Sequence, residues 1–507
     1  MVGVFALVYA FNFIDRQIPA ILAEDIRRDL QVDDAQLGFL FGTAFAVFYA
    51  LFGIPLGRLA DGWRRVPLMA LGLALWSAMT VVSGFATSFT LLALARVGVG
   101  IGEASAAPTA FSMIADLFPK ERRATALSVY SAGLYLGGGA ALPIGGLVSS
   151  GWNAAYPGGG PLGLVGWQAA FVAVGLPGLL LALWVLSLRE PEREGRAQVE
   201  PGAWRRFGAE LAAILPPLTI LSAARRGRLA RNLVTLALVG ASAGALALWT
   251  GDRAQWAAYG LGVYALLSWA DGLARTDPDA HRHIVASPLM LAAVAGFGSV
   301  SFVTYATGFW GAPYTLRTFY PSPDAPALVL TGMVARSEIA LVLGVAGSIA
   351  AAMGVVFFGA LADRWRRRDA AGRVYTVMLS VVLHVVLLWI LYQVTDLRLY
   401  YFLTPVAVFV SVGLVGPAVA TLQDLVPERM RATASSAYVL GATMFGLALG
   451  PYAAGKVAAV TGSLRTGVLG ITAIAPVTLL LLWYVARRLG ARKAEDELNP
   501  AIPARQS

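Results

Sequence analysis

The stretch ADLFPKERRATALSVY at residues 115–130 returns in recognisable form as QDLVPERMRATASSAY at residues 423–438. Both copies keep an aspartate, a proline, an Arg-Ala-Thr triplet and a final tyrosine, and equivalent positions lie 308 residues apart. A second pair, GRLADGWRR at 57–65 and GALADRWRR at 359–367, is offset by 302 residues. Two independent matches at nearly one offset predict a duplicated chain whose halves share one fold and face each other.

The composition indicates the medium in which the chain folds. Of its 507 residues, 58% are hydrophobic and only 13% are charged, whereas soluble domains carry about 25% charged residues. Apolar stretches of about 20 residues, long enough to cross a bilayer, recur along the chain. We predict an all-α membrane protein with about 14 spans, at 2–23, 36–60, 68–86, 89–113, 124–149, 166–188, 231–250, 254–273, 286–311, 338–361, 374–394, 397–420, 431–456 and 464–487.

Other classes of protein find little support in the sequence. The net charge of +10 comes from arginines in short loops between spans, where they orient a membrane protein, so no nucleic-acid partner is predicted. The chain has no cysteine, which excludes disulfides and cysteine-bound metal. GIGEAS at 100–105 follows no strand and is not a nucleotide-binding loop. We therefore predict neither an enzyme, nor a metal site, nor a bound cofactor.

Basic residues alternate from one side of the predicted spans to the other. The turn at 86–88 and the loop at 150–165 contain none, and Arg27 and Arg28 are outnumbered by acidic neighbours. The positive-inside rule therefore predicts that both termini are cytoplasmic. Only three lysines accompany the many arginines, which favours a bacterial source and hence the inner membrane. The basic loops that would be cytoplasmic lie at 61–67, 119–125, 189–210, 363–373, 427–433 and 487–493.

The spans group into two sets of six with a surplus pair between them. Neither repeat has a counterpart of this pair, so we expect an inserted hairpin that packs outside the two six-helix sets. Lys456, near the end of its span, is expected to extend toward the membrane surface. The predicted organisation is an N-terminal six-helix half at 1–188, a cytoplasmic linker at 189–230, the hairpin at 231–273, a C-terminal six-helix half at 286–487 and a cytoplasmic tail at 488–507.

These motifs resemble those of a known family. The two GxLADxWRR-like loops are similar to the signature loop of the major facilitator superfamily, and RVGVGIG (96–102) and GAALPIGG (139–146) resemble its fourth- and fifth-helix patterns. FNFIDR, GIGEAS, ADLFPKERR and GFW most resemble its spinster-like transporters. The resemblance implies two six-helix halves around a central cavity, rocker-switch alternating access and ion coupling. Gly62 departs from the pattern, because the family has a basic residue there.

Two acidic residues lie near the middle of predicted spans. Asp15 and Glu103 are each roughly 14–15 Å, or about nine to ten residues, from an end of their helix. An isolated charge at this depth costs about 3 kcal/mol or more, so each carboxylate needs a partner or a proton. Arg16 is available to both, and Arg96 lies two turns from Glu103. We predict that Asp15, Glu103 and Arg16 couple transport to protons; the alternative is a static network that joins two helices.

The predicted substrate site combines an anchor for an anionic headgroup with an aromatic wall. Phe302, Tyr305 and Phe309 recur at helical spacing, a pattern that also suits a lipid-facing or core stripe. Gly308 and Pro313 predict a break in this helix. Arg96 is equally consistent with a packing clamp. The full predicted set is Arg16, Asn12, Phe13, Arg96, Tyr130, Tyr135, Phe302, Tyr305, Phe309 and Trp310.

Charges at the cytoplasmic ends of the spans predict a gate. Asp61 and Asp363 end equivalent helices, where a carboxylate can pair with a basic residue of the opposite half or with a helix N-terminus. Such pairs would stabilise the outward-facing state and break when the protein opens inward. Solvated turns are the alternative. The remaining candidates are Arg64, Arg65, Asp116, Arg122, Arg123, Arg364, Asp424, Arg429 and Arg431.

Residues and resemblance together predict a proton-coupled secondary active transporter of an amphipathic lipid-like or organic substrate. The expected partners are this substrate, protons and membrane lipids, and the chain is expected to be a monomer. The lipid component follows from the resemblance to the spinster-like group. Two alternatives remain: a small organic-anion or drug transporter of the same fold, and an uncoupled lipid scramblase or sensor.

Overall fold

The computed structural model describes residues 1–193, 199–329, 334–427 and 430–498, apart from the side chains of residues 120, 121, 124, 432 and 492–498. This part of the chain is helical, and its one β-bridge joins Pro326 to Val334. Thirteen helices or helix runs within it are long and apolar enough to cross a membrane. The prediction of an all-α membrane protein is confirmed.

The N-terminal half contains six candidate spans, two of which are broken. The break between α5 and α6 directly follows Glu103, and that between α2 and α3 falls at Gly42. The helices are α1 (Val2–Leu30), α2 (Asp34–Phe41), α3 (Thr43–Gly62), α4 (Arg65–Gly84), α5 (Phe89–Glu103), α6 (Ala106–Leu117), α7 (Lys120–Ala155), the short η1 (Pro161–Gly163) and α8 (Gly166–Leu186).

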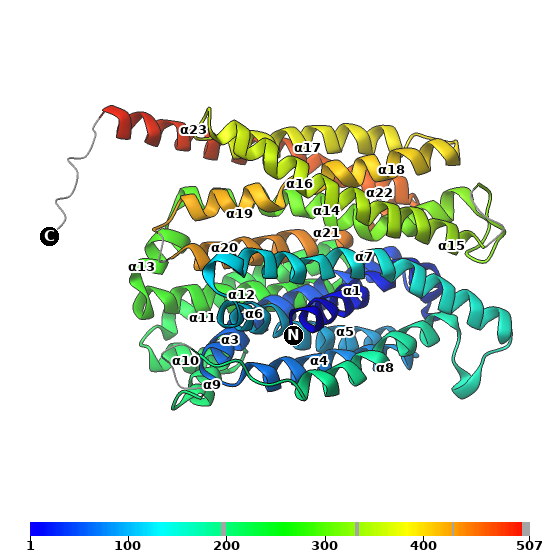
Figure 1. The fold of residues 1–507 in the computed structure, drawn as a ribbon, viewed down its shortest axis with the longest axis horizontal. Helices are drawn as coiled ribbons and strands as arrows, with labels where there is room; N and C mark the ends of the chain where they lie inside the picture. The colour runs from blue at the N-terminus through cyan, green and yellow to red at the C-terminus, as the bar shows by residue number, and fades with distance from the viewer. Residues whose placement is uncertain (194–198, 330–333, 428–429, 499–507) are drawn as a thin grey trace.

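The C-terminal half repeats this arrangement, with π-helical segments inside two of its spans. Its helices are α14 (Pro288–Phe319), α15 (Ala335–Ile339), η3 (Ala340–Ala346), α16 (Gly347–Arg366), α17 (Gly372–Leu391), α18 (Leu397–Ser411), α19 (Val415–Asp424), α20 (Arg431–Gly441), η5 (Ala442–Leu447), α21 (Gly450–Thr461), α22 (Leu464–Gly470), η6 (Ile471–Ile474) and α23 (Ala475–Leu498). In Figure 1 this half lies along one side of the bundle and the N-terminal half along the other.

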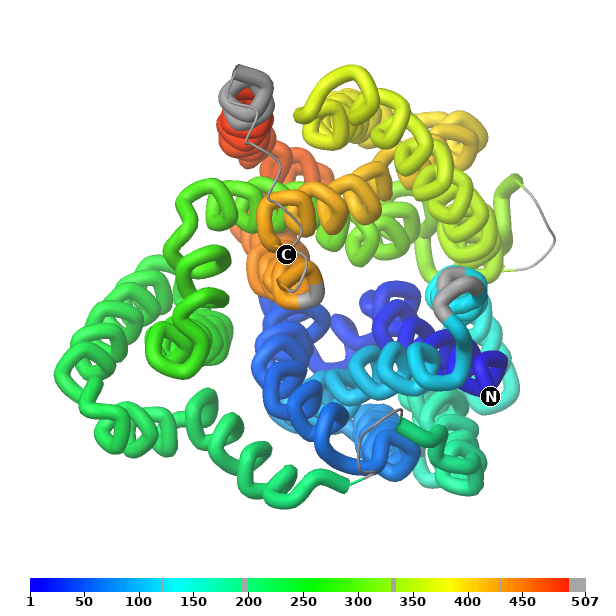
Figure 2. The backbone as a smooth tube through the Cα atoms, turned by 60° about the vertical axis from the view of Figure 1, so that its left-hand side comes forward, coloured from blue at the N-terminus to red at the C-terminus, as the bar shows by residue number. Residues whose placement is uncertain are grey.

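The chain between the halves forms a separate group of helices. α9 (Ala203–Ile214) and α10 (Leu218–Arg225) meet at 106°, and α11 (Leu229–Thr250) and α12 (Arg253–Thr276) pack against each other as a hairpin. The short α13 (Pro278–Ala280) and η2 (His281–Val285) lead into α14. Figure 2 shows this group to one side of both halves.

The hairpin contacts both halves of the bundle. α12 packs on α3 of the N-terminal half. The Oδ2 atom of Asp252, between α11 and α12, accepts a hydrogen bond from the Tyr452 hydroxyl (2.8 Å) and lies 2.8 Å from Nζ of Lys456 in the C-terminal half. Lys456 thus reaches the turn between α11 and α12, where its charge is neutralised by the hairpin, and the expectation that it extends toward the membrane surface stays a prediction.

Glycines in α5 determine how closely the helices around Glu103 can pack. A Cβ atom on Gly100 would lie 2.5 Å from the carbonyl oxygen of Phe45 in α3, and one on Gly102 would lie 2.7 Å from the carbonyl oxygen of Gly72 in α4. Only glycine permits this approach without displacement of the backbone. The GVGIG sequence thus lets α5 pack closely against α3 and α4. This packing sets the position of Glu103, the last residue of α5.

We expect Gly100→Val to destabilise the protein by about 1–3 kcal/mol, because the added side chain overpacks the α3–α5 contact. Thermal unfolding in detergent, followed by the loss of monodisperse protein, measures the change. Gly53→Val is the matched control, since a Cβ on Gly53 meets nothing within 4 Å. Equal melting temperatures for the two variants would contradict this account of the α5 glycines.

Candidate functional site

An ion pair joins α1 to the end of α5 inside the N-terminal half. Nε of Arg16 donates to Oε2 of Glu103 at 2.6 Å. The Glu103 side chain is fully buried and that of Arg16 is 16% exposed. A buried pair of this kind is stable only while both partners remain, because removal of one leaves an uncompensated charge. The predicted meeting of Arg16 and Glu103 is therefore present in this conformation.

Three aromatic rings surround the Arg16 guanidinium. Its Cζ atom lies 4.5 Å from the centre of the Tyr49 ring, 4.9 Å from that of Phe45 and 5.3 Å from that of Phe13. Each distance is within the range of a cation–π contact. The rings hold the guanidinium in place and exclude solvent from one side of it. Phe13 was predicted from the sequence. Phe45 and Tyr49 were not, although their four-residue spacing on one helical face was the available signal.

Asp15 and Arg96 form the second layer of the site. Both are 1% exposed. Nη1 of Arg96 donates to the backbone carbonyl of Asp15 at 3.3 Å rather than to its carboxylate, and its Cζ atom lies 5.4 Å from the centre of the Phe45 ring. Oδ1 of Asp15 has no hydrogen-bond partner among the described residues. Two charged residues are thus buried beside the Arg16–Glu103 pair without a direct ion pair between them.

Buried polar atoms without partners are concentrated around this site. Such atoms are rare in folded proteins and call for an explanation, such as a role in catalysis or in binding an ion or water. Eight of the fourteen in the described part of the chain belong to α1, α4, α5 and α7: Arg123 Nε, which lies at one end of α7, and Asn12 Oδ1, Asp15 Oδ1, Trp76 Nε1, Ser77 Oγ, Arg96 Nε, Glu103 Oε1 and Tyr130 Oη. The predicted candidate Asn12 belongs to this group.

The predicted aromatic residues divide between two places. Tyr130 is 1% exposed and stacks on Tyr9, with ring centres 4.5 Å apart, and Tyr9 contacts the edge of Phe13. Tyr305 lies within electrostatic range of Arg16 from α14 of the other half. Tyr135 is half-buried, on the same helix as Tyr130. These residues form the aromatic side of the Arg16 site.

Phe302, Phe309 and Trp310 belong to an apolar cluster between helices. The Phe309 ring packs on Phe41 of α2 at 4.8 Å, and Nε1 of Trp310 donates to the Pro451 carbonyl at 2.8 Å. Phe302 packs against the same apolar cluster. In this conformation the three contribute to helix packing. The predicted break at Gly308 and Pro313 is wrong, since α14 runs without interruption from Pro288 to Phe319.

The basic end of the bundle is the end at which α3, α6, α8 and α16 finish, and the far end is the opposite one. At the basic end, charged residues of the N-terminal half pair within that half. Arg65 is fully buried and binds Asp116 and, at 3.1 Å, Glu190. Arg193 donates to the Asp61 carbonyl and, at 2.7 Å, to those of Ala60 and Trp63. Burial and the nearby Arg65 lower the pKa of the Arg193 guanidinium.

Two further gate candidates of this half lie nearby. Arg64 is exposed, and Nη2 of Arg123 donates to the Ala115 carbonyl at 2.6 Å.

The basic end of the C-terminal half has its own charge cluster. Nη1 of Arg373 lies 2.6 Å from Oδ2 of Asp424, and Nη2 lies 3.4 Å from Oδ1 of Asp363. The Asp363 side chain is 67% exposed. Arg364 and Arg431 are also exposed, and Arg429 lies outside the described residues. α19 and α20 pack mainly on helices of their own half, and α6 does the same in the N-terminal half.

At the far end, ion pairs cross between the two halves. Nε of Arg317 in α14 lies 2.7 Å from Oε1 of Glu24 in α1, and the same guanidinium forms two 2.7 Å contacts with the Asp34 carboxylate. Arg336 in α15 is fully buried and binds Oδ2 of Asp25 at 2.6 Å and the Ser149 hydroxyl. We call Glu24, Asp25, Asp34, Arg317 and Arg336 the far-end latch.

Close backbone packing accompanies the far-end latch. A Cβ atom on Gly38 of α2 would lie 2.5 Å from the Pro451 carbonyl oxygen of α21, and one on Gly42 would lie 2.8 Å from that of Leu447. The two halves therefore meet at the far end with little space between them. The gate was predicted at the basic end, and the far-end latch was not predicted. The signal in the sequence was the acidic run at 24–34, whose partners are two isolated arginines in the C-terminal half.

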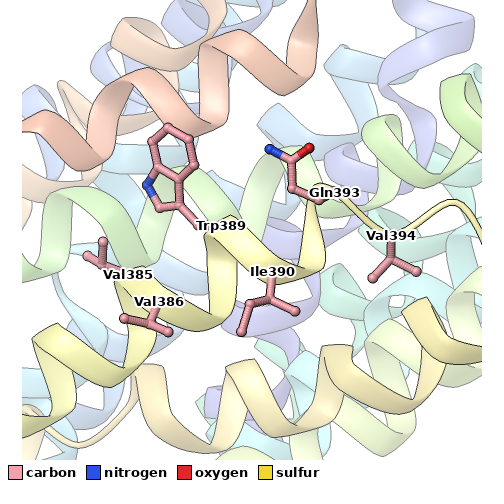
Figure 3. Close-up of a pocket in the computed structure, with 6 residues that line it drawn as sticks. All are labelled: Val385, Val386, Trp389, Ile390, Gln393 and Val394. Carbon is pink, nitrogen blue, oxygen red and sulfur yellow. The ribbon is translucent and has the colours of Figure 1, made fainter.

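An apolar depression on the surface of the C-terminal half lies outside the site. It has a volume of about 560 Å³ and is lined by Val385, Val386, Trp389, Ile390, Gln393 and Val394 (Figure 3). All six residues belong to α17 or follow it. Trp389 and Ile390 are each 49% exposed, as expected for side chains that face lipid.

Comparison with known proteins agrees with this architecture. The family model for the Major Facilitator Superfamily matches residues 5–451. A relative named "MFS-type efflux pump", from Mycolicibacterium smegmatis, is 26% identical over 95% of this chain and 88% of its own length. The sphingosine-1-phosphate transporter SPNS2 of Danio rerio is 33% identical over 27% of this chain and 27% of its own.

The fold has counterparts among solved structures. A bacterial homologue of the human lysosomal transporter spinster, solved in an inward-facing and occupied conformation, superposes with a TM-score of 0.69 and 23% identity, covering 96% of both chains. These relatives and neighbours are transporters rather than enzymes. This chain is therefore an integral membrane transporter that belongs to the major facilitator superfamily and resembles its spinster-like members.

Proposed function

We propose that the protein is a proton-coupled secondary transporter of an amphipathic anion. The observation that carries the proposal is the buried Arg16–Glu103 ion pair, 2.6 Å long, beside the buried carboxylate of Asp15. Buried ionisable residues in a membrane bundle mark substrate and proton pathways. A transporter that bound a neutral substrate without protons would have no need of these charges.

Competition for Arg16 explains how an anion and a proton are coupled. An anionic headgroup that binds the Arg16 guanidinium displaces the Glu103 carboxylate. The released carboxylate remains in surroundings where its charged form is unfavourable, so it takes up a proton. Substrate and proton therefore occupy the site together, and departure of the anion allows Glu103 to lose its proton and re-form the pair. Asp15, also buried and without a direct ion pair, is the second proton acceptor.

The surroundings of Arg16 favour a substrate with an apolar part. Phe13, Phe45 and Tyr49 contact the guanidinium, and Tyr9 and Tyr130 extend the aromatic surface. A lipid-like molecule with an acidic headgroup would place the headgroup on Arg16 and its chain on these rings. The name of the SPNS2 relative supports such a substrate. The name of the efflux-pump relative supports the second candidate, a smaller drug-like or organic anion.

Alternating access would use the two ends of the bundle in turn. The structure is latched at the far end, while the helices of the basic end pack within their own halves. By the positive-inside rule the basic end and both termini are cytoplasmic, so we assign this conformation to the inward-facing state. Asp61 and Asp363 are the proposed gate of the opposite state. We propose the bacterial inner membrane as the location and a monomer as the working unit.

Proton movement in proteoliposomes tests the coupling. We expect lysophosphatidic acid or a sphingoid phosphate to drive proton flux, reported by a pH-sensitive dye inside the vesicles. Asp15→Asn and Glu103→Gln should each reduce this flux by at least about 10-fold, the factor that corresponds to 1.4 kcal/mol. Glu192→Gln, which alters an exposed carboxylate in the linker, should leave the flux unchanged.

The result also separates the alternatives. Flux driven only by hexuronates or drug-like anions would select the small-solute transporter. Lipid transfer that persists in both carboxylate variants and ignores an imposed pH gradient would reduce the Arg16–Glu103 pair to a structural contact. In that case the uncoupled scramblase or sensor would replace the proposal.

A further inference from the structure

The base of the inserted hairpin carries a group of arginines that the proposed transport mechanism does not use. α10 ends at Arg225, α11 begins at Leu229 and α12 ends at Thr276, so their basic residues gather at one end of the hairpin. Side-chain and backbone contacts connect several of them. We call these residues the hairpin cluster: Arg225, Arg226, Arg228, Arg231 and Arg275.

Acidic side chains neutralise only part of the hairpin cluster. Oδ1 of Asp271 lies 3.4 Å from Nη1 of Arg228 and 3.1 Å from Nε of Arg231. Arg275 donates to the backbone carbonyl of Arg226 instead of a carboxylate. Within the described chain, Arg225 and Arg226 form no ion pair. Asp277, the next acid after α12, caps α13 by accepting from the Ala280 amide at 3.0 Å. The guanidinium groups of Arg225, Arg226 and Arg275 thus remain available to an external anion.

The position of Arg226 is set by a glycine of α12. Nη1 of Arg226 occupies the space that a Cβ atom on Gly272 would need. The guanidinium therefore lies directly against the α12 backbone, next to the carbonyl that receives Arg275. This contact restricts the Arg226 side chain, so less conformational entropy is lost when it binds an anion.

An apolar groove runs along the hairpin from the region of this cluster. It has a volume of about 460 Å³ and lies between α11 and α12. Pro216, in the bend before α10, and Leu236 are among its lining residues. Leu236 lies five residues, or roughly 7–8 Å of helix, beyond Arg231 of the hairpin cluster. The other lining residues are mostly small or apolar: Val239, Gly240, Ala243, Gly244, Ala247, Ala257, Gly260 and Leu261, with Arg253, Trp256 and Tyr264.

The outer surface of α11 shows that this groove opens toward lipid. None of the residues in its apolar window is buried, and Leu233, Leu238 and Leu248 are 44%, 65% and 83% exposed. A cationic group at one end of an apolar groove matches the shape and polarity of a phospholipid. Arginine clusters at the ends of membrane helices attract anionic headgroups by about 1 kcal/mol for each basic residue.

We propose that the hairpin cluster and the groove together form a binding site for an anionic phospholipid. Its phosphate contacts Arg226 with the flanking Arg225 and Arg275, and one acyl chain lies along the groove beside Gly244. Because α12 packs on α3 and Asp252 pairs with Lys456, the bound lipid lies along a hairpin that contacts both halves. The site is independent of Arg16 and of the transported substrate.

Native mass spectrometry of the purified full chain tests the site. The protein is titrated with phosphatidylglycerol or phosphatidylcholine of the same acyl composition. We expect preferential binding of phosphatidylglycerol, and at least about 10-fold weaker binding by the triple variant Arg225→Gln/Arg226→Gln/Arg275→Gln, since each arginine contributes about fivefold. Gly244 lines the groove, and a Cβ atom added there meets no atom within 4 Å, so Gly244→Leu should place its side chain in the groove and weaken binding as well.

A charge-matched control separates a specific site from general attraction. Arg367→Gln/Arg368→Gln/Arg488→Gln removes three basic residues near the same end of the bundle and should retain full phosphatidylglycerol binding. Equal loss in this control, equal binding of both lipids, or unchanged binding by Gly244→Leu would overturn the proposal. So would binding of glycerol phosphate as tight as that of the lipid. Melting temperatures verify that all variants are folded.

Discussion

Replacement of Arg16 by alanine should abolish substrate-driven transport. The substitution removes the hydrogen bond to Glu103 and the proposed contact with the substrate anion. Hydrogen bonds to charged groups are worth about 1.5–3 kcal/mol, so substrate affinity should fall by about 10- to 150-fold. Scintillation proximity binding of a labelled lysolipid, followed by uptake into proteoliposomes, measures both effects.

Two further variants distinguish loss of binding from loss of folding. Arg16→Ala leaves Glu103 buried without a partner, which destabilises the protein strongly. The neutral pair Arg16→Gln/Glu103→Gln removes both charges and should melt close to the wild type, yet remain inactive. Arg16→Lys keeps the charge but loses the planar guanidinium that contacts Phe45 and Tyr49, so we expect partial activity. Full transport by the double variant would refute a role for Arg16 in substrate binding.

Loss of the far-end latch should shift the protein away from the conformation in which the two halves are joined at the far end. In Arg317→Gln/Arg336→Gln, the carboxylates of Glu24, Asp25 and Asp34 lose their partners across the interface. Breaking a buried ion pair costs about 3–5 kcal/mol, enough to change the ratio of two conformations by more than about 100-fold. The far end should therefore open, and the population of the latched conformation should fall.

Spin labels across the far end report this opening. The chain has no cysteine, so Gln31→Cys and Thr461→Cys introduce the only two labelling sites, one on each half. Electron double resonance should give a longer distance in the latch variant than in the unmodified pair. Arg398→Gln removes an exposed arginine at the same end and should leave the distance unchanged. A single, unaltered distance in the latch variant would mean that apolar packing alone, such as that at Gly38, keeps the halves together.

The latch and the Arg16 site suggest how the transport cycle is driven. In this conformation, ion pairs connect the halves at the far end. In the interior, Glu103 forms an ion pair with Arg16. In the proposed mechanism, exchange of the Glu103 carboxylate for a substrate anion, with protonation of Glu103, replaces one ion pair of Arg16 by another at the bundle centre. Opening of the far end separates Arg317 and Arg336 from their carboxylates. The two events involve different residues, so the variants above can test them independently.

The fold follows from features that the sequence displays directly. Apolar stretches of spanning length and few charges leave helices in a membrane as the stable solution, because backbone polar groups must be satisfied within the chain. The repeats at 115–130 and 423–438 indicated two equivalent halves. Asp15, Arg16 and Glu103 stood out because charges are costly at mid-membrane depth. Each of these conclusions depends on local composition or spacing, which needs no tertiary information.

Only the tertiary structure decided which charges meet. Arg16 could have paired with Asp15 or Glu103, and the close approach of α5, permitted by Gly100 and Gly102, selects Glu103. The far-end latch joins residues 283–311 positions apart, a separation that no local pattern encodes. The aromatic residues Phe309 and Trp310 belong to that interface because α14 continues without a break and meets α2 and α21 there. Contacts between distant helices depend on packing of the whole bundle, which the sequence of any single span leaves open.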